Sequence, residues 1–222
     1  MQKEIMFENI KTVFFDYDGT LHNSIRIYGP AFRKAYQYLV DSGLTEDREW
    51  SDAEISYWLG YSPPEMWKEF MPSLDERVRN KCSAIIGEEM KNLTEKGKAL
   101  LYDGALDILK YLQSKGYRLV FISNCKTAYK DTHSNLFGLN EFFSSLVCSE
   151  DYDYIPKSEI LRYIKKQYDE EMVIVGDRAQ DIDAGKNNNI YTIGCSYGFG
   201  LKGELDCADV IISDIRDLMK YL

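Results

Sequence analysis

Two aspartates, Asp16 and Asp18, stand two residues apart between a run of apolar residues and a Gly-Thr pair. A short apolar run that ends in a turn signal predicts a buried strand, so both carboxylates would lie where that strand ends. Open α/β sheets bind their ligands at this edge. Two like charges there repel each other and lose hydration, which favours a bound cation or compensating hydrogen bonds. An ordinary acidic turn fits this segment equally well, because Asp and Gly are common in turns.

Polar residues follow the other apolar runs of the chain in a similar way. Each alone is ordinary turn or helix-cap chemistry. Together they add a hydroxyl, a cation and a second carboxylate pair at the same edge of the predicted sheet. These residues are Ser123 with Asn124, Lys157, and Asp177 with Asp181.

The elements that must position these side chains alternate between strands and helices in the second half of the chain. Alternation of this kind predicts a parallel sheet that is covered by helices on both faces. The sequence predicts strands at 117–123, 145–148, 172–175, 190–194 and 209–212, and helices at 103–115, 127–137, 158–168, 181–188 and 215–222.

The segment between Leu21 and Lys98 has a different character, because no strand is predicted there. It contains helical patterns at 30–42, 51–59, 65–70 and 74–96. Pro30 suits the first turn of a helix, and Ser51 with Glu54 forms a plausible capping box. We therefore expect a core of residues 1–21 and 98–222, with a helical insert at 22–97 above the carboxyl edge of the sheet.

The composition limits the class of partner. The chain has 222 residues and a formal charge of −9, without a dense Lys/Arg block, which argues against nucleic acid or an anionic membrane as the main partner. No apolar stretch is long enough to span a bilayer, and the first residues lack the apolar core of a signal peptide. Five scattered cysteines predict reduced thiols in a cytoplasmic protein.

The polar residues resemble the four motifs of the haloacid dehalogenase-like (HAD) hydrolase superfamily. Motif I, DxDGT(L/V), is matched by Asp16–Leu21, motif II by Ser123, motif III by Lys157, and motif IV, GDxxxD, by Gly176–Asp181. The match covers nearly the whole chain and is similar to phosphoglycolate phosphatase-like members, with 22–97 where their helical C1 cap lies. The resemblance implies a Rossmann-like, three-layer αβα core with an inserted α-helical cap.

The resemblance also implies catalytic roles. Asp16 would be the nucleophile that attacks phosphorus and forms an aspartyl-phosphate, and Asp18 would be the general acid–base. Mg²⁺ would be held by Asp16, the backbone carbonyl of Asp18, and Asp177. A carboxylate at position 18 favours phosphoryl transfer, because dehalogenases of the family do not need to protonate a leaving alkoxide.

Other residues are implied to bind the substrate. The hydroxyl of Ser123, the backbone amide of Asn124 and the Lys157 side chain would hold the phosphoryl oxygens. Asp181 would orient Lys157 or a metal-bound water. Gly60–Pro64 resembles the specificity loop of the family, so Tyr61 is a further candidate, although aromatic residues at such spacing often pack within the cap.

Some positions depart from the family pattern or stay open. His22-Asn23-Ser24 replaces the common Val-Asp-Ser, and His22 is either a substrate contact or a hinge residue. Cationic side chains of the cap are candidates for contact with a distal substrate charge, although most such residues lie on the surface. These cationic candidates are Arg26, Arg33 and Lys68.

The function expected from this pattern is a Mg²⁺-dependent phosphatase that hydrolyses a small phosphorylated metabolite. One enzymatic alternative is a sugar-phosphate mutase of the β-phosphoglucomutase type, which shares all four motifs. Another is a phosphonatase with a Schiff-base lysine in the cap. A non-catalytic binding protein with the same fold is the alternative from another class. The substrate and the oligomeric state are not indicated by the sequence.

Overall fold

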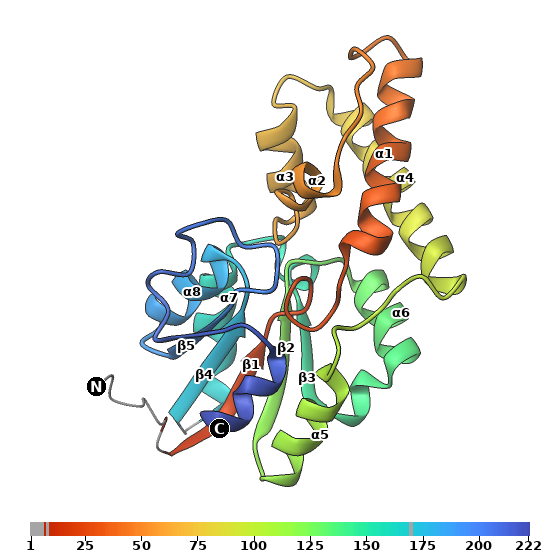
Figure 1. The fold of residues 1–222 in the computed structure, drawn as a ribbon. Coiled ribbons are helices and arrows are strands. Elements are labelled where there is room, and N and C mark those ends of the chain that lie inside the picture. Colours follow the sequence, from red (N-terminus) through yellow and green to blue (C-terminus); the bar gives the residue numbers. More distant parts are fainter. Residues whose placement is uncertain (1–6, 8, 169–170) are drawn as a thin grey trace.

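The centre of the protein is a parallel sheet (Figure 1). A computed structural model describes residue 7 and residues 9–168 and 171–222. In this part of the chain six parallel strands form one sheet in the order β3-β2-β1-β4-β5-β6. The strands are β1 Ile10–Phe15, β2 Arg118–Ser123, β3 Phe143–Cys148, β4 Glu171–Gly176, β5 Tyr191–Cys195 and β6 Val210–Ile212. The strand order reverses between β1 and β4, which is where sheets of this type bind ligands.

Helices cover both faces of the sheet. Successive residues of β1 point to opposite faces, so the strand presents apolar side chains on both. Val13 and Phe15 pack with α5 Ala105–Ser114 and a 3₁₀ helix at Ile215–Lys220. Phe14 packs on the other face. The helices of that face are α7 Lys157–Ile164 and α8 Ala179–Lys186, while α6 Thr127–Phe137 contacts β3 and packs with the first face. The predicted three-layer αβα core is confirmed.

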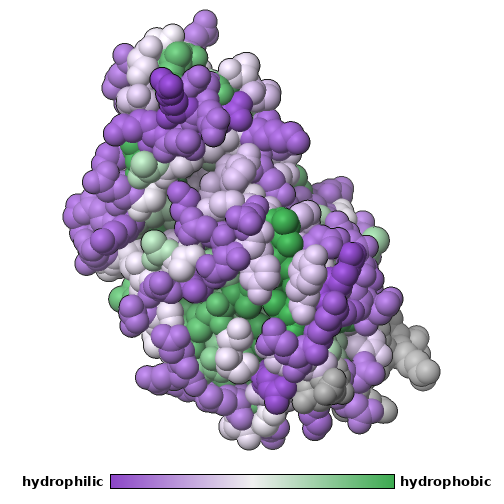
Figure 2. Space-filling view, turned by 180° about the vertical axis from the view of Figure 1, so that it is seen from behind, coloured by the Kyte–Doolittle hydropathy of each residue, from purple (hydrophilic) through white to green (hydrophobic). Residues whose placement is uncertain are grey.

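A group of helices rises above the carboxyl edge of the sheet (Figure 1). It consists of α1 Ile25–Asp41, α2 Asp52–Ser56, α3 Pro63–Phe70 and α4 Glu76–Glu95, and we call it the helical insert. The insert has an apolar cluster of its own, in which α1 packs along α4. Figure 2, a view from the opposite side, shows hydrophilic side chains over most of its outer face. The apolar side chains of the insert therefore serve its interior and the side that faces the core.

Two helix predictions differ from the structure. Helix α1 begins at Ile25, so the prediction of a helix that opens at Pro30 was wrong. Pro30 lies in the second turn, where it removes one hydrogen bond, and burial of the neighbouring Ile27 and Ala31 holds the helix there. The C-terminal helix is a 3₁₀ helix rather than an α-helix. The predicted capping box of Ser51 and Glu54 and the bounds of α6 are confirmed.

Four of the five cysteines are buried and none is disulfide-bonded, while Cys207 is exposed. In the described residues, no helix has both the length and the apolar character needed to cross a bilayer.

Candidate active site

Asp16 and Asp18 lie directly beyond the end of β1, at the point where the strand order reverses. The amide of Asp16 still donates to the carbonyl of Val175 on β4, at 2.9 Å. The chain then turns at Gly19, which has a φ of +90°. A Cβ at this glycine would lie 2.1 Å from an Asp177 oxygen, so only glycine lets the turn approach that carboxylate. The motif thus brings the turn and Asp177 together.

Lys157 joins two of the carboxylates. Its Nζ donates to Asp16 Oδ1 and to Asp181 Oδ1, both at 2.6 Å, and all three side chains are buried. Burial and the neighbouring Asp181 raise the pKa of Asp16 to about 7, although Lys157 opposes the shift. The pKa of Lys157 is also raised, because its two carboxylate partners outweigh its burial. Lys157 therefore remains a cation at the base of the site.

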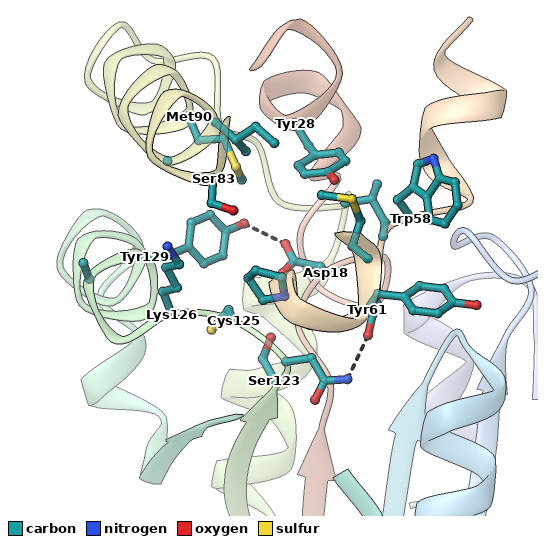
Figure 3. Close-up of a pocket in the computed structure, with 18 of the residues that line it drawn as sticks. Asp18, Tyr28, Trp58, Tyr61, Ser83, Met90, Ser123, Cys125, Lys126 and Tyr129 are labelled. Atoms are coloured by element: carbon teal, nitrogen blue, oxygen red, sulfur yellow. Dashed lines mark hydrogen bonds between the residues drawn. The ribbon is translucent and has the colours of Figure 1, made fainter. Parts of the chain in front are cut away.

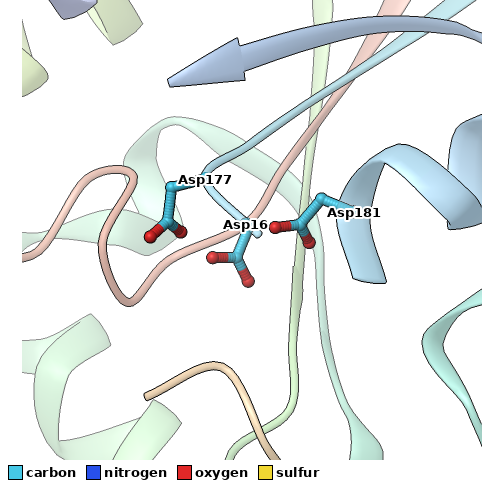
Figure 4. Close-up of side chains that lie close together, drawn as sticks. All are labelled: Asp16, Asp177 and Asp181. Carbon is cyan, nitrogen blue, oxygen red and sulfur yellow. The ribbon is translucent and has the colours of Figure 1, made fainter. Parts of the chain in front are cut away.

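Asp177 completes an acidic cluster with Asp16 and Asp181 (Figure 4). One ligand oxygen from each lies within 4.8 Å of the others. Asp177 accepts hydrogen bonds from Thr20 Oγ1 at 3.3 Å and from the Phe199 amide at 2.6 Å. Burial and the charge of Asp16 still raise its pKa well above the ordinary value.

The donor set of this cluster fits a hard divalent cation. Carboxylate oxygens are the ligands that Mg²⁺ prefers, and a cation there would offset the repulsion that raises the pKa of Asp16 and Asp177. Asp181 already binds Lys157 with Oδ1 and the Arg178 amide with Oδ2. Asp16 and Asp177 also accept hydrogen bonds on both of their oxygens, so hydrogen bonding alone does not distinguish the three carboxylates as ligands.

Asp18 has different surroundings from Asp16. Its Oδ1 accepts a hydrogen bond from Tyr129 Oη at 2.6 Å and lies 3.2 Å from His22 Nδ1 (Figure 3). Burial by itself would raise the pKa of Asp18, but the hydrogen bonds of His22 and Tyr129 outweigh it and lower the pKa. The two neighbouring aspartates thus have pKa values shifted in opposite directions.

The two histidines lie together behind Asp18. His22 and His133 have ring centroids 4.7 Å apart, and Tyr17 Oη lies 2.8 Å from His133 Nδ1. Both rings are buried, and burial lowers the pKa of His133 to about 3. His22 therefore belongs to the support of Asp18 at the start of the insert.

A cavity of about 310 Å³ lies between the core and the insert. Its lining includes five of the predicted site residues, which are Asp16, Asp18, Tyr61, Ser123 and Asn124. Lys157 does not line it but reaches Asp16, and Asp177 and Asp181 lie behind Asp16. The structure brings the predicted residues to one edge of the sheet, with Asp16 and Asp18 facing the insert.

Core residues hold the segment 57–61 of the insert over this cavity. Asn124 Nδ2 donates to the Gly60 carbonyl at 2.8 Å, and Arg178 donates to the carbonyls of Tyr57 and Leu59. The Arg178 guanidinium lies 5.5 Å from the centre of the Tyr61 ring, and Figure 3 shows that this ring points away from Ser123. Contact between Tyr61 and a phosphate stays a prediction.

Sequence reasoning did not single out several lining residues. Tyr129, which binds Asp18, lies in the first turn of α6. The one sequence signal for it is a tyrosine hydroxyl six residues after Ser123. Tyr28 and Met90 come from α1 and α4, whose inner faces no motif indicates. The three cations suggested for a distal substrate charge, Arg26, Arg33 and Lys68, do not line the cavity.

Comparisons with known proteins agree with these observations. The family model described as haloacid dehalogenase-like hydrolase matches residues 13–195. A phosphoglycolate phosphatase of Pasteurella multocida is 26% identical over 199 residues, with 85% of this chain and 87% of that protein covered. The pyrophosphatase PpaX of Listeria innocua is 25% identical over 225 residues, with 96% and 97% covered. The structure of a predicted phosphatase from Clostridium acetobutylicum superposes with a TM-score of 0.77 at 23% identity, covering 95% and 97%.

Proposed function

Because the chain belongs to the haloacid dehalogenase-like hydrolase family, we propose that it is a Mg²⁺-dependent phosphatase that hydrolyses a small phosphomonoester. The observation that carries the proposal is the position of Asp16. Its carboxylate is bound by Lys157 within an acidic cluster and faces a cavity that Asp18 and Ser123 also line. A nucleophile, a proton donor and a phosphate-binding hydroxyl thus border one space.

The first chemical step is attack of an Asp16 oxygen on the phosphorus atom. A bond forms between Asp16 and phosphorus, and the bond between phosphorus and the leaving oxygen breaks. Asp18 gives its proton to that oxygen, so that an alcohol leaves. The hydroxyl of Ser123, the Asn124 amide and Lys157 stabilise the charge on the remaining phosphoryl oxygens.

The second step releases phosphate and restores the enzyme. Asp18, now ionised, accepts a proton from a water molecule that attacks the aspartyl-phosphate. The bond between Asp16 and phosphorus breaks, and the carboxylate returns. The lowered pKa of Asp18 favours the ionised form that this base step needs, whereas the preceding acid step needs Asp18 protonated.

Mg²⁺ would be held by Asp16, Asp177 and the backbone carbonyl of Asp18. Bound there, it supplies neutralising charge for the approach of a carboxylate to a phosphate dianion. Asp181 keeps Lys157 in position through the 2.6 Å hydrogen bond. Thr20 and the Phe199 amide orient Asp177 in the same manner.

Residues 22–97 would act as a cap on a core of residues 1–21 and 98–222. Opening of the cap admits the substrate, and closure excludes water during the first transfer. The hydrogen bonds from Asn124 and Arg178 to the segment 57–61 support a closed arrangement. A small phosphorylated metabolite is the proposed substrate and the cytoplasm the proposed location.

The experiment is a measurement of phosphate release with and without Mg²⁺, on sugar phosphates, phosphoglycolate, nucleotides and pyrophosphate. We expect Asp16→Asn to lose release by at least about 10³-fold, since the covalent route is removed. Asp183→Asn is the matched control, because Asp183 is an exposed aspartate on α8. Equal activity of wild type and Asp16→Asn would refute the aspartyl-phosphate mechanism.

Two other outcomes would replace the proposal. Interconversion of sugar phosphates without net phosphate release would indicate a mutase. Binding of phosphorylated ligands without any turnover, by wild type as well as by Asp16→Asn, would indicate a non-catalytic protein.

A further inference from the structure

We propose that the substrate carries an apolar, ring-sized leaving group without a second anionic group. This inference rests on the proposed phosphatase function and concerns the side of the cavity that faces the insert. Seven residues of α1, α3, α4 and the loop before α3 form the apolar part of that wall. They are Tyr28, Trp58, Leu59, Met66, Trp67, Ile86 and Met90.

The same wall lacks the charges that a second anion would need. Apart from Asp16 and Asp18, the charged residues among the described lining are Lys91 and Lys126. Lys91 is 67% exposed and lies 3.9 Å from Glu95, so its charge is largely met by solvent and by that carboxylate. Lys126 stands at the start of α6 on the core side of the cavity, where its charge interacts with Glu150. A distal carboxylate or phosphate would therefore lose its hydration against apolar side chains.

Other cationic side chains of the insert and of the core that could bind a second anion already bind groups of the protein itself. Arg33 binds the Asp52 carboxylate and the Trp50 carbonyl. Lys34 binds Glu89. The buried guanidinium of Arg178 donates to Glu204 and to carbonyls of the insert. Phosphoglycolate and pyrophosphate, the substrates in the names of two relatives, both need a cation for their second anionic group.

Space for a ring is left beside α4. Gly87 lies in the middle of this helix at the exposed edge of the cavity, and a Cβ placed on it would meet no atom within 4 Å. Glycine lowers the stability of a helix interior, so its presence here keeps volume free at a cost to the helix. The cavity volume of about 310 Å³ is at the lower end for ligand pockets and suits a small ring rather than a nucleotide.

The wall also contains a polar group, the hydroxyl of Tyr28. Burial raises the pKa of Tyr28, whose hydroxyl has no hydrogen-bond partner among the described residues and points from α1 into the cavity (Figure 3). Because it faces the cavity, water or a polar atom of a ligand can reach it there. We assign it to a single neutral oxygen or nitrogen on the leaving group, close to the ester.

The test compares three phosphomonoesters by Mg²⁺-dependent phosphate release. They are ethyl phosphate, 2-phenylethyl phosphate and phosphoglycolate. The first two release alcohols of similar acidity, so a difference between them reports contact with the leaving group. We expect kcat/KM for 2-phenylethyl phosphate to exceed that for ethyl phosphate at least about tenfold, as burial of a ring predicts. Phosphoglycolate should be no better than ethyl phosphate.

A binding measurement separates failure of the inference from failure of the proposed function. Asp16→Asn protein is titrated with the same esters, and binding is followed by calorimetry. If no ester is hydrolysed but 2-phenylethyl phosphate binds about tenfold more tightly than the others, the phosphatase proposal is wrong and the ligand class stands. If ethyl phosphate is hydrolysed but phosphoglycolate is preferred in both assays, the ligand class is wrong.

Gly87→Leu tests the location of the ring. Leucine favours the helix and occupies the free volume, so the preference for 2-phenylethyl over ethyl phosphate should fall toward one. Ala84→Leu is the matched control on the exposed side of α4, outside the lining, and should keep the wild-type preference. A preference that survives Gly87→Leu would overturn the assignment.

Discussion

Arg178→Met should detach the segment 57–61 from the core. The Arg178 side chain is 2% exposed and binds Glu204 Oε2 at 2.8 Å as well as two carbonyls of the insert. Breaking a buried ion pair costs about 3–5 kcal/mol. Because Glu204 keeps 18% exposure, part of its charge can be rehydrated, and we expect the lower value, about 3 kcal/mol. For a chain of this length, this free energy corresponds to a fall in Tm of about 9 °C.

Calorimetry and hydrogen exchange check this prediction. Scanning calorimetry gives the Tm, and faster exchange of the amides in 57–61 reports release of the insert from the core. Arg162→Met is the matched control, because Arg162 is 51% exposed and pairs with Glu159 along α7, so the Tm of this variant should stay within about 2 °C of wild type. A Tm of Arg178→Met equally close to wild type, with unchanged exchange in 57–61, would refute the reasoning.

Three further predictions concern the acidic residues. Tyr129→Phe removes a hydrogen bond that lowers the pKa of Asp18, so the limb of the kcat/KM profile that reports Asp18 should move up by about one pH unit; an unmoved limb would contradict this. Asp177→Asn should raise the Mg²⁺ concentration for half-maximal activity about tenfold or more, measured by titration of phosphate release; an unchanged midpoint would exclude Asp177 as a ligand. The folded-state pKa values of Asp16 and Asp177 are raised, so the metal-free protein gains stability from their protonation below about pH 4 and loses the part due to Asp16 as the pH rises through about 7. Mg²⁺ should therefore raise the Tm more at pH 8 than at pH 5 in thermal unfolding, and an equal shift at both would count against a metal at these carboxylates.

The core of the fold could be predicted because its patterns are local. Each buried strand is a short apolar run, and the site residues of the core lie at or just beyond the end of a strand or in the first turn of a helix, as Ser123 and Lys157 do. Parallel strands deliver their carboxyl ends to one edge, so the order of the motifs was enough to bring Asp16, Lys157 and Asp177 together. The start of α1 was missed because a proline rule was applied to a helix that tertiary packing holds five residues earlier.

The contacts of the insert could not be predicted in this way. Helical periodicity shows that α1 and α4 have apolar faces, but it does not show whether a given residue faces the partner helix or the cavity. Tyr28 and Ile86 belong to the apolar cluster of the insert and also line the cavity. The contacts of Arg178 could not be predicted either, because its partners Glu204 and Leu59 are far from it in sequence.

The two aspartates of the first motif show how much of a site depends on such distant partners. Asp16 and Asp18 are the same residue type on one short segment, yet the pKa of Asp16 is raised and that of Asp18 is lowered. Asp16 meets the negative charge of Asp181 from α8, whereas Asp18 meets Tyr129 from α6. In the metal-free protein these directions run against the proposed roles, because a nucleophile reacts in its ionised form and an acid in its protonated form, and a cation beside Asp16 would lower its pKa again.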